Sequence, residues 1–97
     1  MNYFFHPEAE SEFFDAIEYY EKCEKGLGYD FATEVYFTVE RILAHPKAWQ
    51  FMEEGLIRRA LVKRFPYGII YAEQNREIYI LSVMHLHREP YYWKHRT

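Results

Sequence analysis

The segment HLHREPYYWKHR, residues 85–96, combines side chains that transfer protons, carry positive charge and present flat rings. It contains three histidines, three lysine or arginine residues and three aromatic rings. An imidazole with its ordinary pKa of about 6.5 exchanges protons near neutral pH, so His85 and His87 are candidates for a general acid or base. Packing alone does not require so many titratable groups beside so many rings, which indicates a site.

Metal binding is the other chemistry open to the His85-Leu86-His87 spacing. No cysteine and no convincing set of carboxylates accompanies the two histidines, so we expect no metal. The sequence also has no G-x-S-x-G motif, Walker loop or dinucleotide fingerprint, and we expect no cofactor. The single cysteine, Cys23, cannot form an internal disulfide, which suits a reducing cytoplasm.

Basic residues of a second segment, residues 57–64, are expected to lie near residues 85–96. If residues 57–64 form a strand, Arg59 and Lys63 share one face and Arg58 and Arg64 the other. The strand that leads into residues 85–96 lies close by in an antiparallel sheet, which predicts a concave basic patch framed by His85, His87, Arg88, Tyr91, Tyr92 and Trp93. Rings interleaved with basic groups are typical of surfaces that bind single-stranded nucleic acid. The candidate residues for binding a target or a phosphate are therefore Arg59, Lys63, Arg64, Arg88, Trp93 and Arg96.

A plainer interpretation stays open for each of these residues. A tryptophan near a chain end commonly packs against the core, and basic residues on a sheet are commonly solvated.

Charge is divided unevenly between the two halves of the chain. Residues 1–56 carry 12 acidic and 4 basic groups, whereas residues 57–97 carry 3 acidic and 8 basic groups, within a net charge of -3. Local charge and not the total determines the field at a surface, so this asymmetry indicates interaction with a partner. The alternative is an acidic helical layer that neutralises a basic sheet within one domain.

The length of 97 residues, of which 49% are hydrophobic, predicts one folded domain over residues 1–97. No basic and apolar leader opens the chain and no apolar run is long enough to cross a bilayer, so we expect a cytoplasmic protein.

Two helices are predicted in the first half. Pro7 suits the first position of a helix over residues 8–25, whose apolar stripe is Ala9, Phe13, Ile17 and Tyr20. After Gly26 and Gly28, a second stripe of Phe31, Val35, Val39 and Ile42 predicts a helix over residues 29–44. The short connection favours an antiparallel helix hairpin.

Strands are predicted over residues 2–6, 57–64, 67–73 and 77–84, which are rich in β-branched and aromatic residues and are separated by turn signals. The stretch around residues 49–55 is expected to be irregular. The predicted fold class is α+β, with the helix hairpin on one face of a small antiparallel sheet and the other face left to solvent or to a partner.

Four segments, taken in this order, resemble the RelE/ParE superfamily of bacterial type II toxin–antitoxin (plasmid stabilisation) systems. They are HPEAESEFFDAIEYYE, GLGYDFATEV, IRRALVKRFPYGIIY and ILSVMHLHREPYYWKHR. The resemblance implies the same α+β fold and a growth-inhibiting toxin that a cognate antitoxin neutralises. It also implies one of two targets: DNA gyrase for ParE-like members, or messenger RNA on the ribosome for RelE-like members.

The resemblance adds Tyr92 to the candidate catalytic residues, because RelE-like members use a tyrosine in the tail. It also implies an arginine after the tyrosine that begins the middle strand, yet Gly68 follows Tyr67 here. By analogy with oxyanion-hole donors, losing such a group costs about 3 to 4 kcal/mol of transition-state stabilisation. We therefore favour a ParE-like toxin over a RelE-like endonuclease. A domain of another class, a non-toxic adaptor that only binds protein, is the further alternative.

Overall fold

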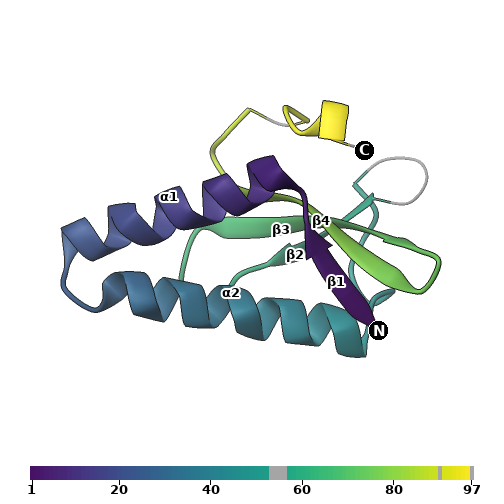
Figure 1. Cartoon of the computed structure of the whole chain (residues 1–97), viewed down its shortest axis with the longest axis horizontal. Helices are drawn as coiled ribbons and strands as arrows, with labels where there is room; N and C mark the ends of the chain where they lie inside the picture. The colour runs from purple at the N-terminus through teal and green to yellow at the C-terminus, as the bar shows by residue number, and fades with distance from the viewer. Residues whose placement is uncertain (53–56, 90, 97) are drawn as a thin grey trace.

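Two antiparallel helices lie across one face of a four-stranded sheet (Figure 1). The computed structural model describes residues 1–52, 57–89 and 91–96. The elements in chain order are β1 (Asn2–Phe5), α1 (Pro7–Cys23), α2 (Leu27–Ala44), β2 (Ile57–Leu61), β3 (Tyr67–Gln74), β4 (Glu77–His85) and a 3-10 turn, η1 (Lys94–Arg96). The α+β class and the helix hairpin are confirmed. The part of the expected irregular stretch at positions 53–55 falls outside the described residues.

The sequence suggested a wholly antiparallel sheet, but the sheet is mixed. The strand order is β1-β4-β3-β2, in which β1 runs parallel to β4 and the other neighbours are antiparallel. Parallel neighbours need a long crossover connection. Here the chain passes through the helix hairpin and two strands before it returns to pair with β1.

The turns explain where the predicted strand boundaries differ. The strand expected over 57–64 ends at Leu61, because Arg64 adopts a left-handed backbone with φ of 71° in the turn before β3. The connection from β3 to β4 is a two-residue hairpin whose central residues, Asn75 and Arg76, both have positive φ. Such turns match the twist of the paired strands.

The larger core lies between the helices and the sheet. Ala9 and Phe13 of α1 are buried, and so is the whole predicted stripe of α2, namely Phe31, Val35, Val39 and Ile42. Ile17 and Tyr20 are partly buried against the same cluster.

A smaller core lies on the opposite face, which the sequence left to solvent or to a partner. It contains Ile70, Leu81, Met84 and Trp93, so the chain's own tail covers part of this face.

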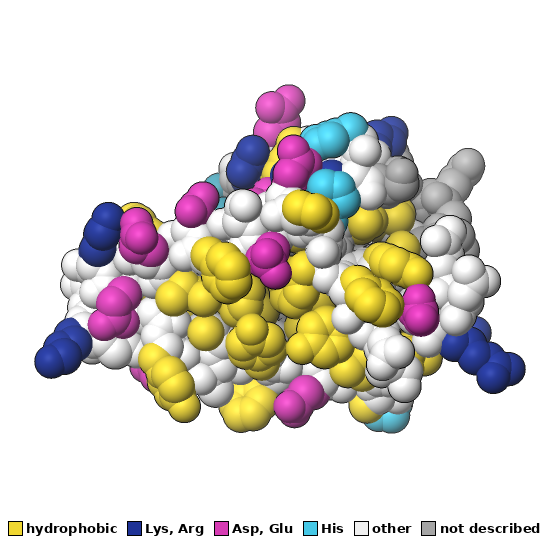
Figure 2. All heavy atoms as spheres, viewed as in Figure 1, with side chains coloured by type: hydrophobic (Ala, Val, Ile, Leu, Met, Phe, Trp, Pro, Cys, Tyr) yellow, Lys and Arg dark blue, Asp and Glu magenta, His cyan; other side chains and the backbone are white. Residues whose placement is uncertain are grey.

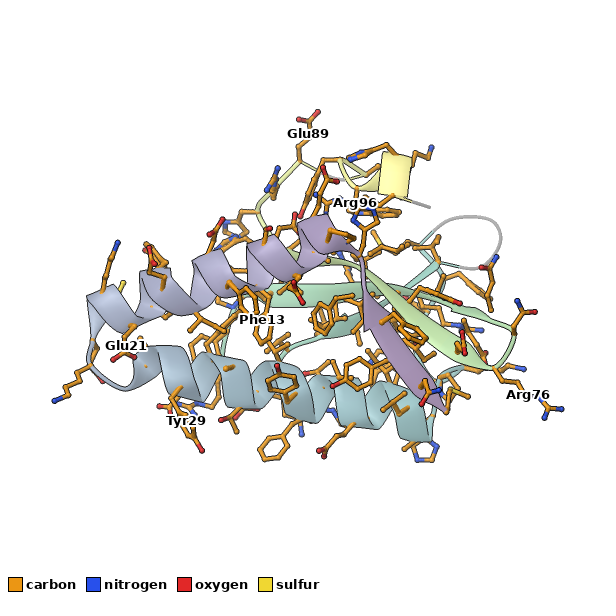
Figure 3. The ribbon with its side chains drawn as sticks, in the orientation of Figure 1. Phe13, Glu21, Tyr29, Arg76, Glu89 and Arg96 are labelled. Atoms are coloured by element: carbon orange, nitrogen blue, oxygen red, sulfur yellow. The ribbon has the colours of Figure 1, made fainter. Side chains whose placement is uncertain are left out.

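The connection between the helices depends on Glu21 and Gly28. The Glu21 carboxylate accepts hydrogen bonds from the backbone N–H groups of Gly26 and Gly28, at 3.0 and 3.1 Å, and so caps the start of α2 from α1 (Figure 3). A Cβ atom at Gly28 would lie 2.6 Å from the Ile17 carbonyl oxygen, which is closer than a real contact. The helices approach each other this closely only because residue 28 has no side chain.

We predict that Gly28→Ala lowers the free energy of unfolding by about 2 kcal/mol, because the added methyl group pushes the backbones of α1 and α2 apart. Chemical denaturation measures this change. Gly68→Ala is the matched control: its Cβ would meet only side-chain atoms of Arg59 and Leu86, at 3.2 and 3.4 Å, and these can move. Equal losses for the two variants would contradict the prediction.

Candidate functional site

A cleft of about 230 Å³ lies where α1 passes the end of β4. Three of the predicted site residues, His85, Arg88 and Tyr92, line it together with Tyr67. Two carboxylates, those of Glu12 and Asp15, also line it. The tail and the sheet therefore form a cleft as expected, but the cleft is mixed in charge and not uniformly basic.

Glu12 is the centre of the hydrogen bonding in this cleft, and its side chain is only 14% exposed. One carboxylate oxygen, Oε1, accepts hydrogen bonds from Ser82 Oγ at 3.0 Å, Val83 N at 3.1 Å and Arg96 Nη1 at 2.9 Å. The other, Oε2, accepts from the Tyr92 hydroxyl at 2.7 Å and lies 3.9 Å from Arg88 Nη1. One carboxylate thus ties the helix to β4 and to the tail.

The Tyr92 hydroxyl is occupied by this network. Besides its bond to Glu12, it lies 2.7 Å from Ser82 Oγ, and the Arg88 guanidinium stacks 3.7 Å from the centre of the ring. Burial raises the pKa of Tyr92 to about 12, and the bond to Glu12 acts in the same direction. A phenol with so high a pKa is a poor proton acceptor at neutral pH.

Arg96 holds the end of the tail. Its side chain is 6% exposed, and Figure 3 shows it beside the first turn of α1. It donates from Nε to Glu8 at 2.9 Å and from Nη1 to Glu12 and to the Leu81 carbonyl. His95 Nε2 lies 2.7 Å from the same Glu8 oxygen, and this contact lowers the pKa of Glu8. Two carboxylates and a carbonyl surround its guanidinium, and phosphate binding by Arg96 stays a prediction.

Trp93 also makes its contacts within the fold. Its side chain is 1% exposed in the core on the sheet face away from the helices, where it packs with Ile70, Leu81 and Met84. Its indole N–H has no hydrogen-bond acceptor among the described residues. Trp93 therefore packs as a core residue, and target binding by its ring stays a prediction.

His85 lines the cleft, and His87 lies next to His85. His85 is half-buried and packs edge-on against Tyr67, with ring centres 5.3 Å apart. His85 Nδ1 accepts a hydrogen bond from the backbone N–H of His87, and the two rings lie 5.2 Å apart. His87 is exposed. His85 shares the cleft with Arg88, while no group of three or more metal-ligating side chains occurs within the described part of the chain.

Arg59 lies apart from this cleft. It lines a separate groove with Trp49, Met52, Leu61 and Tyr91. Its aliphatic stem crosses Gly68, since a Cβ at Gly68 would lie 3.2 Å from Arg59 Cγ and Cδ. The guanidinium that the RelE pattern places at position 68 is absent, but the neighbouring strand β2 carries a basic side chain across the same spot.

The remaining predicted basic residues do not gather around the cleft. Arg64 lies 3.6 Å from Asp30 and 3.8 Å from Glu34 of α2, so it pairs with the helix layer. Lys63 is exposed in the turn after β2. The single concave patch expected from the sequence is therefore divided between the cleft and the Arg59 groove.

Charge pairing supports the idea of an acidic helical layer that neutralises basic groups within one domain. Arg64, Arg88 and Arg96 each lie within ion-pair distance of a carboxylate from α1 or α2. Within residues 1–52, 57–89 and 91–96, Arg59, Lys63 and Arg76 have no such partner, which leaves their charge available to an external anion.

Glu12 is the residue that sequence reasoning missed. A signal was present, because Glu12 lies three residues after Ala9 and four before Ala16, and both alanines are buried. A carboxylate within the buried stripe of a helix is expected to have partners, because a charge is costly to bury without them.

The fold and the cleft define a small α+β domain in which a tail is tied back onto a helix hairpin and sheet. This architecture is similar to that of a solved chain described as the chromosomal ParDE TA system from P. aeruginosa. The TM-score is 0.76 at 16% sequence identity, over 88% of this chain and 95% of that one. The fold is therefore ParE-like. No family model and no curated protein matches the sequence.

We predict that Glu12→Ala lowers the free energy of unfolding by about 3 kcal/mol, because it leaves Arg96 and the Val83 N–H without their acceptor. In a Trp49→Phe background, the emission of Trp93 shifts to longer wavelength if the tail loosens. Glu10→Ala, on the exposed side of the same helix, is the control. It changes neither the free energy of unfolding nor the emission wavelength of Trp93. A Glu12 variant as stable as the control would show that the tail is held by packing alone.

Alkaline pH provides a second test of the same network. The folded-state pKa of Tyr92, about 12, exceeds its ordinary value of 10.0, so the neutral phenol stabilises the fold. This contribution is complete below pH 10 and is lost as the pH rises toward 12. Tyr71 behaves in the same way, because burial also raises its pKa to about 12.

We therefore predict that the free energy of unfolding falls between pH 10 and 12 and that Tyr92→Phe makes this fall smaller without abolishing it. Denaturation at fixed pH values, with ultraviolet titration of the phenols, measures both effects. Tyr29→Phe is the control, since the Tyr29 side chain is 76% exposed. An identical pH profile for wild type and Tyr92→Phe would refute the assigned pKa.

Proposed function

We propose that this chain is the toxin of a toxin–antitoxin pair, a ParE-like growth inhibitor that acts in the cytoplasm and is neutralised by a cognate antitoxin. The observation that carries the proposal is the ParE-like fold, since the similar solved chain belongs to a system described as ParDE. A helix of sufficient length and apolarity to cross a membrane does not occur among the described residues. DNA gyrase is the proposed target.

Three features, two in the cleft and one at Gly68 on β3, support gyrase poisoning over RNA cleavage. The Tyr92 hydroxyl is engaged by Glu12 and Ser82, and its pKa is moved further from neutrality. The carboxylates of Glu12 and Asp15 line the space that an RNA phosphate would enter, where they repel it. Gly68 supplies no guanidinium at the position where the RelE pattern has one.

RelE-like cleavage of ribosome-bound messenger RNA is the second candidate, and one observation favours it. His85 lines the cleft with Arg88, and the His87 ring lies 5.2 Å from that of His85, which offers two imidazoles for proton transfer near a cation for phosphate. In this case Arg59, which reaches across Gly68, would contribute a further positive charge. A non-toxic adaptor domain is the alternative of another class, and growth after induced expression separates it from both toxins.

In the proposed mechanism, the target is bound by the exposed basic side chains, Arg59, Lys63 and Arg88. We predict that the purified protein inhibits gyrase supercoiling and that Arg59→Ala or Arg88→Ala weakens inhibition about tenfold, the usual effect of losing a charged contact. Alanine at His87 or Tyr92 has a smaller effect. Arg76→Ala is the matched control, because it removes an equal charge at the β3–β4 turn.

The corresponding growth experiment uses induced expression with and without the reading frame that adjoins the gene. Growth arrest that the neighbour relieves supports a toxin and its antitoxin; unimpaired growth indicates the adaptor. Cleavage of ribosome-bound messenger RNA that is lost on His87 or Tyr92 substitution would reject the ParE-like proposal in favour of the RelE-like one.

A further inference from the structure

A cavity of about 340 Å³ lies on the face of the sheet that is turned away from the helices. Leu81, Ile57 and Ala72 line it, and all three pack in the smaller core of that face. Pockets that hold small molecules have volumes of about 300 to 1,000 Å³. Among the described residues, the cavity shares no lining residue with the cleft or with the Arg59 groove. It is therefore a separate candidate site.

One row of residues across the sheet forms a wall of this cavity. Phe4 pairs with Tyr79, Tyr79 with Ala72, and Ala72 with Ile57, so the row crosses all four strands. Residues directly opposite each other on neighbouring strands share a face of the sheet. All four residues line the cavity. The depression follows from Ala72, whose methyl group is the smallest side chain in the row.

A β-bulge in β4 places Leu81 in the same cavity. The consecutive residues Ile70 and Tyr71 of β3 pair with β4 residues on either side of Leu81, which therefore pairs with no residue of β3 in the described sheet. The Leu81 carbonyl oxygen accepts a hydrogen bond from Arg96 Nη1 at 3.0 Å instead. Bulges redirect side chains and are common beside functional sites. This bulge brings both Leu81 and the tail to the cavity.

Aromatic rings form the β1 side of the cavity. Phe4 stacks on Tyr79, with ring centres 5.6 Å apart and planes inclined by 25°. Phe4 is 46% exposed, so the stack is accessible from solvent. Figure 2 shows hydrophobic side chains that continue from the helix hairpin across β1, while lysine and arginine lie toward the margins of this face. Exposed rings of this kind favour a ligand that itself contains a flat ring.

A hydrogen-bond donor lies at the end of the cavity next to α1. His6, the residue before this helix, lines the cavity. Its Nδ1 accepts a hydrogen bond from the backbone N–H of Glu8 at 3.1 Å. The neutral imidazole therefore carries its proton on Nε2, which is left to donate to another partner. An oxygen acceptor on a ligand matches this donor.

The charge around the cavity favours an uncharged ligand. Among the described lining residues, Arg96 is the only one with a full charge. Glu8 Oε2 and Glu12 Oε1 each lie 2.9 Å from its guanidinium, so this charge is already compensated. An ion that enters a mainly apolar space loses its hydration, and here it meets no unpaired opposite charge in return.

We propose that this cavity binds a small uncharged molecule that combines an aromatic ring with an oxygen acceptor, such as an aromatic ketone, ester or amide. The ring lies over Ala72, between Tyr79 and Ile57, and the oxygen accepts a hydrogen bond from His6 Nε2. This inference concerns a site remote from the cleft and does not rest on the toxin assignment.

The test uses methyl NMR of the full chain with isotope-labelled alanine and isoleucine, because the methyl groups of Ala72 and Ile57 report on the cavity itself. Acetophenone is the probe. Benzoate has nearly the same size but carries a charge, and ethylbenzene lacks the oxygen. We expect acetophenone to shift both methyl signals with a Kd of about 1 mM and to bind about tenfold more tightly than benzoate. Unshifted signals in saturated acetophenone, or equal binding of benzoate, would overturn the proposal.

Filling the cavity provides the first variant. Ala72→Leu places a larger side chain in the depression, and we expect it to weaken acetophenone binding at least about tenfold, as followed by the Ile57 signal. Ala44→Leu is the matched control, since it adds the same side chain at an exposed position at the end of α2. Chemical denaturation verifies that both variants are folded. Undiminished binding by folded Ala72→Leu would place the ligand elsewhere and refute the site.

The second variant, His6→Asn, tests the donor and leaves Ala72 in place, so its result holds even if Ala72→Leu fails to fold. Asparagine keeps an acceptor for the Glu8 N–H at the start of α1 but has no counterpart of Nε2. We expect acetophenone to bind about fivefold more weakly, the usual effect of losing one hydrogen bond, and ethylbenzene to bind as before. Equal effects on the two ligands would refute the assigned donor.

A second copy of the chain is the competing occupant of the cavity. Sedimentation of the wild-type chain and of Ala72→Leu distinguishes it from a small ligand. We expect both to sediment as the same species. A wild-type dimer that is lost in Ala72→Leu would assign the cavity to a second copy and overturn the proposal.

Discussion

The carboxylate of Glu12 is the constraint on which the arrangement of the cleft depends. It accepts hydrogen bonds from a β4 backbone amide, a β4 hydroxyl, a tail phenol and a tail guanidinium. A largely buried charge is tolerated only where hydrogen bonds and an opposite charge compensate for its lost hydration. Glu12 obtains all of them in one place, and in doing so it positions residues 91–96 against the sheet. Trp93 then completes a core that the four strands alone would leave open.

The same network determines which tail residues can act on a target. Arg96 and Tyr92 have the chemical character of site residues, but their polar atoms are used within the chain. Arg88 is in an intermediate position, because it stacks on Tyr92 while more than half of its side chain remains exposed. We therefore propose that target binding falls to groups at the margin of the cleft and on β2, while the hydrogen bonds within the cleft hold the tail in place. This division is what favours binding of a target over proton transfer by the tail.

The two halves of the chain differ in charge for two separate reasons. Part of the acidic excess of the helices compensates basic side chains of the second half, as Arg64 and Arg96 show. Another part surrounds exposed aromatic rings on the outer side of the hairpin, where no basic residue of the described chain pairs with Glu10 or Glu40. Opposite charges thus hold the tail in place on one side, while on the other side these two glutamates have no ion-pair partner in the described part of the chain.

The sequence by itself determined the class of fold, because apolar periodicity and turn residues are local signals. The stripe of Phe31, Val35, Val39 and Ile42 predicted the buried face of α2, and Pro7 the start of α1. Strand direction depends instead on how distant segments meet, so the parallel pairing of β1 with β4 was not predictable from local patterns. The candidate site was anticipated only in part. His85, Arg88 and Tyr92 do share a cleft. However, hydrogen bonds between residues 70 to 84 positions apart in the sequence engage the polar groups of Tyr92 and Arg96 with Glu12. A one-dimensional pattern shows which groups are available for chemistry; tertiary contacts decide which remain free, because a buried polar group is stable only when it finds a partner.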